Sequence, residues 1–195
     1  MRDTIDSLVA ELTPVKPVRV RTGILYASIA TLAAASLIAL FYGVREDLTS
    51  GSPHPMVFVR MVTFLLVGFG VGIPALSLSR PEIAGPKSRY AWKWALAGAS
   101  LLPLAAFIQL MQSPPKSMPE AEAMFQPLTG MECLTYGGFA ALLVGTVMIV
   151  WMRQGAPTSP ERAGLLVGLA AGGFGAAAFS VMCPFNSLIY VATWH

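Results

Sequence analysis

Five apolar stretches, each about 20 residues long, constrain this chain more than any other feature of its sequence. They run over Gly23–Gly43, Val57–Ser79, Ala91–Met111, Cys133–Met152 and Ala163–Met182. A helix of about 20 residues rises about 30 Å, which is the thickness of the hydrocarbon core of a bilayer. Hydrophobic residues make up 55% of the chain and charged residues only 12%, too few to cover the surface of a water-soluble domain. The sequence therefore predicts an all-α, polytopic transmembrane bundle with five full spans.

A sixth apolar segment, Leu188–His195, has only eight residues. Eight residues cannot cross a bilayer as a helix. The segment is either half of a sixth helix or a piece tucked against the other helices. We therefore expect five full spans plus a partial sixth.

The basic residues predict the orientation of the spans, because Lys and Arg in short loops stay on the cytoplasmic side. Ten of the 13 lie before the first span or around the second and fourth connections. The N-terminus is thus predicted to be cytoplasmic, with residues 1–22 forming a cytoplasmic segment and residues 23–195 the membrane domain. Since these charges lie between apolar segments, we expect no direct binding of nucleic acid. The three remaining basic residues, Arg45, Arg60 and Lys116, lie on the outer side.

Ionisable side chains are rare within the spans. Arg60 lies near the outer end of the second span and Lys93 near the inner end of the third, where long side chains can snorkel to the interface. Ion and proton carriers normally need charged groups at depth in the membrane. The sequence therefore argues against transport.

Small residues at a spacing of four predict where the helices pack, because close backbone approach drives helix association in lipid. We interpret these ridges as packing faces within a monomeric bundle rather than a dimer seam. They are Gly164, Gly168 and Gly172 in the fifth span, Gly137, Ala141 and Gly145 in the fourth, and Gly68 and Gly72 in the second.

The chain has two cysteines, and both fall on the predicted outer side. Cys133 opens the fourth span and Cys183 closes the fifth. Antiparallel helices joined by an inner loop bring their outer ends together, so these residues are expected to be neighbours. They admit three interpretations: a structural disulfide or two inert thiols, a redox sensor, or a soft-metal site.

A soft-metal site would need a further ligand beside the two thiolates. Glu132, His54 and His195 are the nearest candidates by position in the sequence or by side of the membrane. The chain has no CxxC or HExxH spacing, so no resident cofactor is predicted. Any metal would bind transiently at Cys133 and Cys183.

The N-terminal segment predicts a short amphipathic helix over Arg2–Leu12. Ile5, Leu8, Val9 and Leu12 follow the spacing of one helical face, and the polar side is acidic. A helix that rests on anionic lipid favours Lys and Arg on its polar face instead. This composition favours docking into the groove of a partner protein, with a membrane-bound tail as the alternative.

Several short motifs, taken in order, resemble the bacterial negative-regulator-of-sigma-F (NrsF) family of membrane anti-sigma factors. The resemblance covers the whole chain. It includes residues 6–15 followed by a basic stretch, Gly43-Val44-Arg45-Glu46-Asp47-Leu48, Met131-Glu132-Cys133-Leu134, Arg153-Gln154-Gly155-Ala156-Pro157, Cys183-Pro184-Phe185-Asn186-Ser187 and Trp194-His195.

This resemblance implies a six-span protein of the bacterial inner membrane that holds an extracytoplasmic-function (ECF) sigma factor through its cytoplasmic N-terminal segment. It also implies that Cys133 and Cys183 take part in sensing oxidative or heavy-metal stress. Family members continue through a complete last helix, so the resemblance further implies that this chain is truncated near His195.

Two other functions compete with a non-enzymatic anti-sigma factor. One is a membrane thiol or metal oxidoreductase that uses the same cysteines, although the chain has no haem-type His pair and no soluble redox domain. The other is a non-catalytic structural subunit of a membrane complex. We favour the anti-sigma factor because the N-terminal helix and the cysteine pair both have a role in it.

Overall fold

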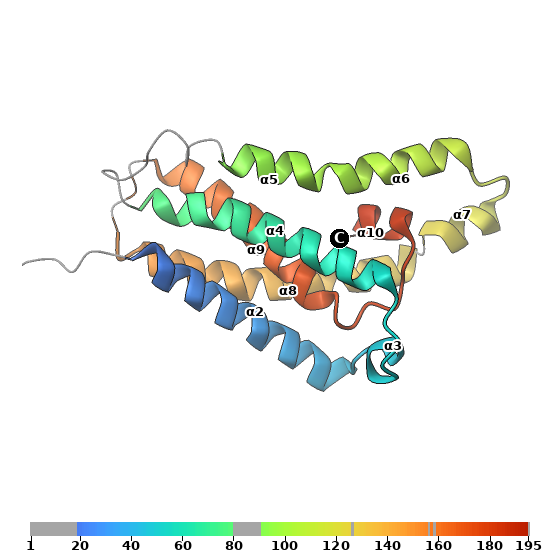
Figure 1. Ribbon diagram of the computed structural model, residues 1–195, viewed down its shortest axis with the longest axis horizontal. Coiled ribbons are helices and arrows are strands. Elements are labelled where there is room, and N and C mark those ends of the chain that lie inside the picture. Colours follow the sequence, from blue (N-terminus) through green and yellow to red (C-terminus); the bar gives the residue numbers. More distant parts are fainter. Residues whose placement is uncertain (1–18, 80–90, 126, 156, 158, 195) are drawn as a thin grey trace, which may run out of the picture.

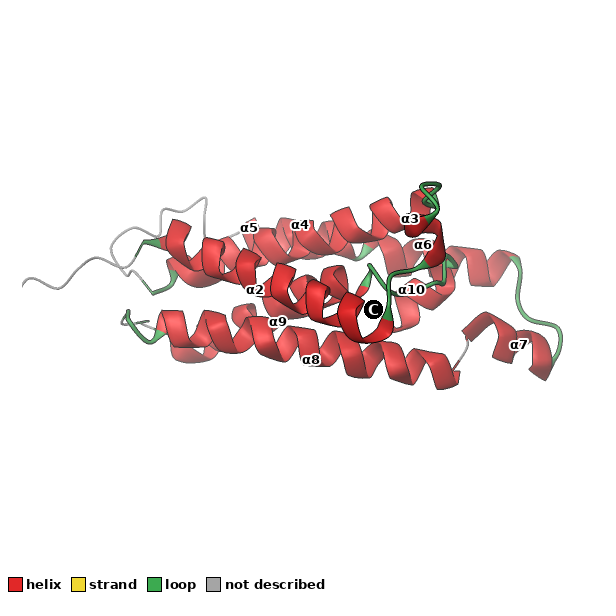
Figure 2. Cartoon of the chain, turned by 90° about the horizontal axis from the view of Figure 1, so that it is seen from below, coloured by secondary structure: helices red, strands yellow, loops and turns green. Residues whose placement is uncertain are grey.

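The computed structural model describes residues 19–79, 91–125, 127–155, 157 and 159–194. These residues form helices joined by turns and loops, without a strand (Figures 1 and 2). The prediction of an all-α bundle is confirmed for this part of the chain. The long helices are α2 (Val20–Tyr42), α4 (Pro55–Ser77), α8 (Pro127–Met152) and α9 (Pro160–Phe179).

Four helical segments in the described part of the chain are long and apolar enough to cross a membrane. They are α2, α4, α9 and the segment Met118–Met152, whose main part is α8 and whose first part is α7 (Met118–Phe125). Their positions agree with the first, second, fourth and fifth predicted spans. The number of crossings and the cytoplasmic N-terminus stay predictions.

The third predicted span is divided into α5 (Ala91–Ala99) and α6 (Leu101–Gln112). Pro103 explains the break, because its ring nitrogen has no hydrogen to donate to the carbonyl of Ala99. The hydrogen bonds on either side are kept, from Ser100 N to Leu96 O and from Leu104 N to Ser100 O. The two helices therefore continue in one direction along the bundle (Figure 1).

Helix α9 is the centre of the bundle and contacts α2, α4 and α8. Within an apolar stretch of α9, 67% of the residues are buried. In the corresponding stretches of the other three candidate spans, the buried share is 28% or less. Those outer helices expose large apolar side chains, among them Leu40, Leu66 and Leu142. An apolar outer surface of this extent matches contact with lipid rather than with water.

Two glycines of α9 allow its close contacts. A Cβ at Gly173 would lie 2.8 Å from Gly68 N of α4, and one at Gly175 would lie 2.7 Å from Ala141 N and Gly137 O of α8. Both contacts are to backbone, which cannot rotate away as a flexible side chain can. The α9 backbone thus touches two neighbouring helices at nearly the same level.

The predicted packing ridge of α9 is wrong. A Cβ at Gly164, Gly168 or Gly172 would meet nothing within 4 Å in the described structure. The spacing of four identifies a common face but cannot say which way that face points, and Gly173 and Gly175 lie on the packed side. The ridges predicted for α4 and α8 do pack, since Cβ positions at Gly68 and Gly145 meet side chains of α9.

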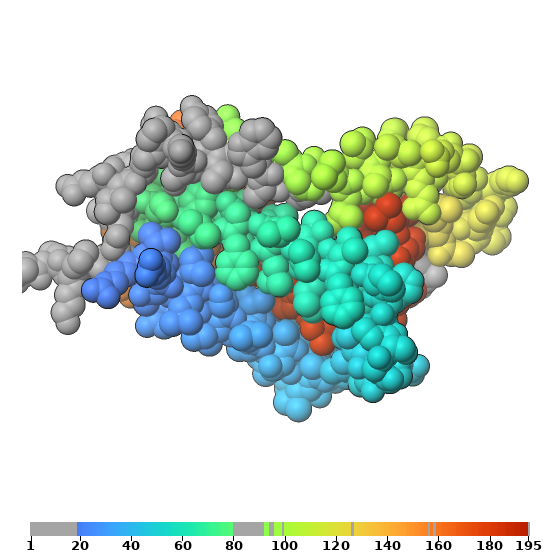
Figure 3. All heavy atoms as spheres, viewed as in Figure 1, coloured from blue at the N-terminus to red at the C-terminus, as the bar shows by residue number. Residues whose placement is uncertain are grey.

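The last helix, α10 (Leu188–Trp194), lies against α6, α7 and α8. Figure 3 shows part of it at the surface between α4 and the α6–α7 region. Trp194 Nε1 donates a 2.6 Å hydrogen bond to Phe125 O, and its indole fills the space beside Gly130. The sequence left two alternatives for this segment, half of a sixth helix or a piece tucked against the other helices. Residues 188–194 are tucked against the other helices, and His195 lies outside the described residues.

Candidate functional site

The two cysteines meet inside the protein, as their positions in the sequence predicted. Cys133 lies in the second turn of α8, and Cys183 lies in the turn between α9 and α10. Both side chains are buried in one apolar cluster with Tyr190. Cys133 Sγ lies 2.8 Å from the Tyr190 hydroxyl, and Cys183 belongs to the same buried cluster. We call this group, Cys133, Cys183 and Tyr190, the thiol cluster.

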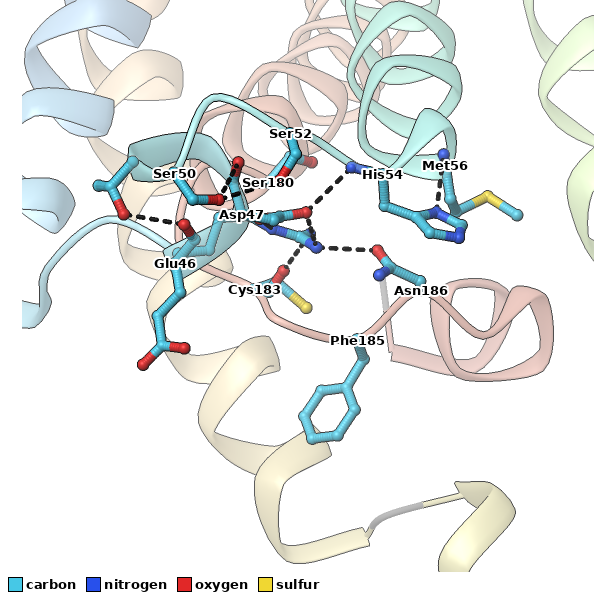
Figure 4. A network of polar contacts seen from close by, with 12 residues as sticks. Glu46, Asp47, Ser50, Ser52, His54, Met56, Ser180, Cys183, Phe185 and Asn186 are labelled. Atoms are coloured by element: carbon cyan, nitrogen blue, oxygen red, sulfur yellow. Dashed lines mark hydrogen bonds and ion pairs between the residues drawn. The ribbon is translucent and has the colours of Figure 1, made fainter.

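Arg45 holds the turn that carries Cys183. This arginine lies three residues after the end of α2, is buried, and donates from Nη1 to Cys183 O at 2.7 Å and from Nη2 to Asn186 Oδ1 at 3.0 Å. Figure 4 labels both acceptor residues. Its backbone N–H also donates to Val181 O. The connection between α2 and α4 is thereby fastened to the turn between α9 and α10.

Asp47 neutralises Arg45 and orients its guanidinium. The carboxylate of Asp47, in the short helix α3 (Glu46–Thr49), accepts from Nε and Nη2 of Arg45 and from the backbone N–H of His54. Arg45 and the His54 N–H hold the pKa of Asp47 below its ordinary value. The pair is therefore intact at neutral pH and weakens only as the pH falls through that lowered pKa.

Arg60 holds the same turn from the opposite side. This residue of α4 is completely buried, and it donates to Phe185 O at 3.1 Å, to Ser180 O at 3.0 Å and to Cys183 O at 3.2 Å. The prediction that Arg60 snorkels to the interface is wrong, because the carbonyl oxygens of this turn offer it acceptors inside the bundle. Two arginines thus share one acceptor, the carbonyl oxygen of Cys183.

The candidate auxiliary ligands lie elsewhere. Glu132 is exposed, and His54 is exposed with its Nδ1 accepting from Met56 N. Among the residues that the structure describes, no group of three or more His, Cys, Asp or Glu side chains could hold a metal ion. Binding of a soft metal at Cys133 and Cys183 stays a prediction, and the third candidate, His195, lies outside the described residues.

A small cavity reaches Cys133 from the side of the bundle. Its volume is about 160 Å³, and it lies between α8 and α9. Gly137, Gly138 and Gly172 form much of its wall, and Trp194 stands at one side. Cys133 lines this cavity, although its side chain is only 4% exposed.

The predicted partner-binding face, Ile5, Leu8, Val9 and Leu12, lies outside the described residues. Its role stays a prediction. Sequence reasoning missed that Arg45 and Arg60 hold the turn that carries Cys183. A signal was present: Arg45-Glu46-Asp47 places a cation beside two carboxylates in a short loop, and Arg60 is the one charge in an otherwise uncharged predicted span.

Comparison with known proteins gives two related regulators. The chain is 28% identical over 198 residues to the anti-sigma-F factor NrsF of Caulobacter vibrioides (strain NA1000 / CB15N), which covers 99% of this chain and 88% of that protein. It is 29% identical over 167 residues to the probable anti-sigma-F factor NrsF of Azospira oryzae (strain ATCC BAA-33 / DSM 13638 / PS), covering 84% of this chain and 74% of the relative.

No solved structure matches the chain. Residues 8–195, which include both cysteines and both arginines of the site, match the family described as negative regulator of sigma F. A match over nearly the full length, together with the two relatives, confirms the resemblance seen in the sequence motifs. The chain belongs to the NrsF family of negative regulators of a sigma factor.

Proposed function

We propose that this protein is an inner-membrane anti-sigma factor that sequesters an ECF sigma factor and releases it when Cys133 and Cys183 are oxidised. The family supplies the sigma factor as the class of partner. The observation that carries the sensing role is the thiol cluster, in which two cysteines distant in sequence share one buried cluster and two buried arginines hold the turn that carries Cys183. The chain acts by binding and release and not as an enzyme.

The chemical step is formation of a disulfide. Cys133 and Cys183 each lose a proton, the two sulfurs form one S–S bond, and two electrons pass to an oxidant such as a hydroperoxide, which is reduced to an alcohol and water. Serine cannot carry out this step. We favour oxidation over metal capture because the described residues offer the thiols no third ligand.

The route from the thiols to the cytoplasm runs through α2. A disulfide would draw the Cys183 turn towards α8, and this turn is bonded to Arg45, which lies three residues after the end of α2. The other end of α2 begins at Val20, within the predicted cytoplasmic segment 1–22 and eight residues after Leu12 of the proposed partner-binding face. A shift of α2 between two positions would therefore alter how that segment is presented to the sigma factor.

The proposed orientation places the thiol cluster outside the cytoplasm. Of the three basic residues counted on that side, Arg45 and Arg60 are buried in the protein, and Lys116 is exposed. The inner-side basic residues that the structure describes are all exposed: Arg19, Arg21, Lys93, Arg153 and Arg162. This supports a cytoplasmic N-terminus, where a sigma factor is available for binding.

Charged substitutions on the N-terminal face test the binding half of this function. Leu8→Asp with Leu12→Asp should weaken co-purification of the sigma factor from membranes about 100-fold or more, because two leucines no longer bury their side chains in the partner. Ser7→Asp, on the polar side of the same predicted helix, is the matched control and should retain the partner. Deletion of residues 2–13 should match the double variant.

Retention of the sigma factor by both the deletion and the double variant would contradict this proposal. Membrane content of each variant is measured in the same preparations by a C-terminal tag. Equal amounts of the full-length and substituted chains then attribute any loss of partner to the segment itself.

A further inference from the structure

Arg60 is an unusual residue for the interior of a membrane bundle. Its side chain is completely buried, and its Nη atoms donate to three carbonyl oxygens while Nε has no hydrogen-bond partner within the described structure. Carbonyl oxygens solvate a guanidinium but do not neutralise it. A buried charge without a counter-ion is costly, so it is retained where it serves a purpose.

The contrast with Arg45 is informative. Both arginines donate to the carbonyl oxygen of Cys183, at 2.7 Å from Arg45 and 3.2 Å from Arg60. Arg45 is paired with the carboxylate of Asp47. Among the described residues, no carboxylate forms an ion pair with Arg60. The two residues hold the same turn, but only Arg60 gives it an unneutralised positive charge.

That charge lies beside the thiol cluster. The fully buried guanidinium of Arg60 contacts the cluster at Cys183, whose carbonyl oxygen accepts from Nη2 at 3.2 Å. The neutral Arg45–Asp47 pair also contacts the turn that carries Cys183. A sulfur that reacts as a nucleophile carries negative charge, and burial in apolar surroundings disfavours this charge. Arg60 is placed to offset that penalty, and the Tyr190 hydroxyl at 2.8 Å can donate a hydrogen bond to the same sulfur.

We propose that Arg60 is the charge partner of the reacting sulfur, so that the thiol cluster is reactive although it is buried. When a thiol gives its proton to solvent, the sulfur anion and the guanidinium form the ion pair that Arg60 otherwise lacks. Arg60 is thus a positioning residue that also promotes thiol reactivity. The inference rests on the proposed function only for the biological use of that reactivity.

Alkylation of the reduced, full-length protein in detergent tests this role. Iodoacetamide and iodoacetate carry out the same reaction, in which the sulfur forms a bond to carbon and iodide leaves, but only iodoacetate is an anion. Arg60→Gln should slow modification by iodoacetamide about tenfold, as expected for loss of one nearby opposite charge. It should slow iodoacetate more, so that the ratio of the iodoacetate rate to the iodoacetamide rate falls. Arg60→Lys should restore both the rate and the ratio.

The matched control removes the other hold on the turn without changing its net charge. Arg45→Gln combined with Asp47→Asn takes away the hydrogen bond to Cys183 O and a neutral ion pair together. Any loosening of the turn changes access for both reagents, and the ratio of the two rates stays at its wild-type value. A purely structural role for Arg60 predicts that both sets of variants behave alike.

A falling ratio in Arg60→Gln but not in the Arg45→Gln, Asp47→Asn variant supports the inference, and an unchanged ratio in Arg60→Gln overturns it. Arg60→Met provides a second neutral variant if Arg60→Gln is not monodisperse, because its side chain adds no buried amide of its own. Failure of the proposed function would look different from failure of this inference. Alkylation would still depend on Arg60, but variants with serine at Cys133 and Cys183 would still release the sigma factor in response to oxidant.

Discussion

Replacing Cys133 and Cys183 with serine should abolish release of the sigma factor under oxidative stress and leave the unstressed state unchanged. Serine keeps the size of each side chain and can still bond to the Tyr190 hydroxyl, which lies 2.8 Å from Cys133 Sγ. It cannot form the S–S bond. Either single substitution should have the same effect, because one remaining thiol has no intramolecular partner in a chain with two cysteines.

A reporter driven by the sigma factor's own promoter measures this effect, with and without a hydroperoxide. Met182→Leu is the matched control, because it removes the neighbouring oxidisable sulfur and keeps both thiols. It should respond like the wild type. Full induction in the double serine variant would show that the thiol cluster is not the sensor.

Gly175→Val should prevent the bundle from folding. A single Cβ at this position would lie 2.7 Å from two backbone atoms of α8, Ala141 N and Gly137 O, so even alanine requires the helices to separate. Overpacking of this kind costs about 3 kcal/mol or more where the neighbour is backbone. Separation of α8 from α9 would also move Cys133 away from Cys183, because α8 carries Cys133 and Cys183 follows the end of α9.

Thermal unfolding in detergent, followed by circular dichroism, measures the loss. Gly168→Ala on the same helix is the control, because a Cβ there meets nothing within 4 Å. It should leave the free energy of unfolding unchanged or raise it by up to about 1 kcal/mol, since alanine favours the helix over glycine. A Gly175→Val protein that unfolds at the wild-type temperature would contradict the packing described above.

The sequence predicted those parts of the fold that depend on the length of an apolar stretch or on the order of the connections. Apolar length identified the long helices, and the order of connections brought Cys133 near Cys183. Apolar length did not show that the third span is divided into α5 and α6, but Pro103, which lacks a backbone donor, marks the place of the break in the sequence. Apolar length measures only whether a stretch can cross, and it does not report a break in hydrogen bonding.

Contacts between helices were harder to predict for a physical reason. The ridge at Gly164, Gly168 and Gly172 has the correct spacing for packing, but the orientation of a helix about its axis depends on its neighbours. Arg60 was likewise judged by its distance from the span end. Its burial depends on carbonyl oxygens of a turn 120 to 125 residues later in the chain, and no local pattern predicts them.

The proposed mechanism depends on one link: the oxidation state of Cys133 and Cys183 controls whether the sigma factor stays bound. Membranes containing the full-length chain with its sigma factor bound are treated with a hydroperoxide, and the released sigma factor is measured beside the fraction of chain that carries the disulfide. The predicted result is release in proportion to the disulfide, rebinding after reduction with dithiothreitol, and no release from the double serine variant. A sigma factor that stays bound while the Cys133–Cys183 disulfide is complete would contradict the account.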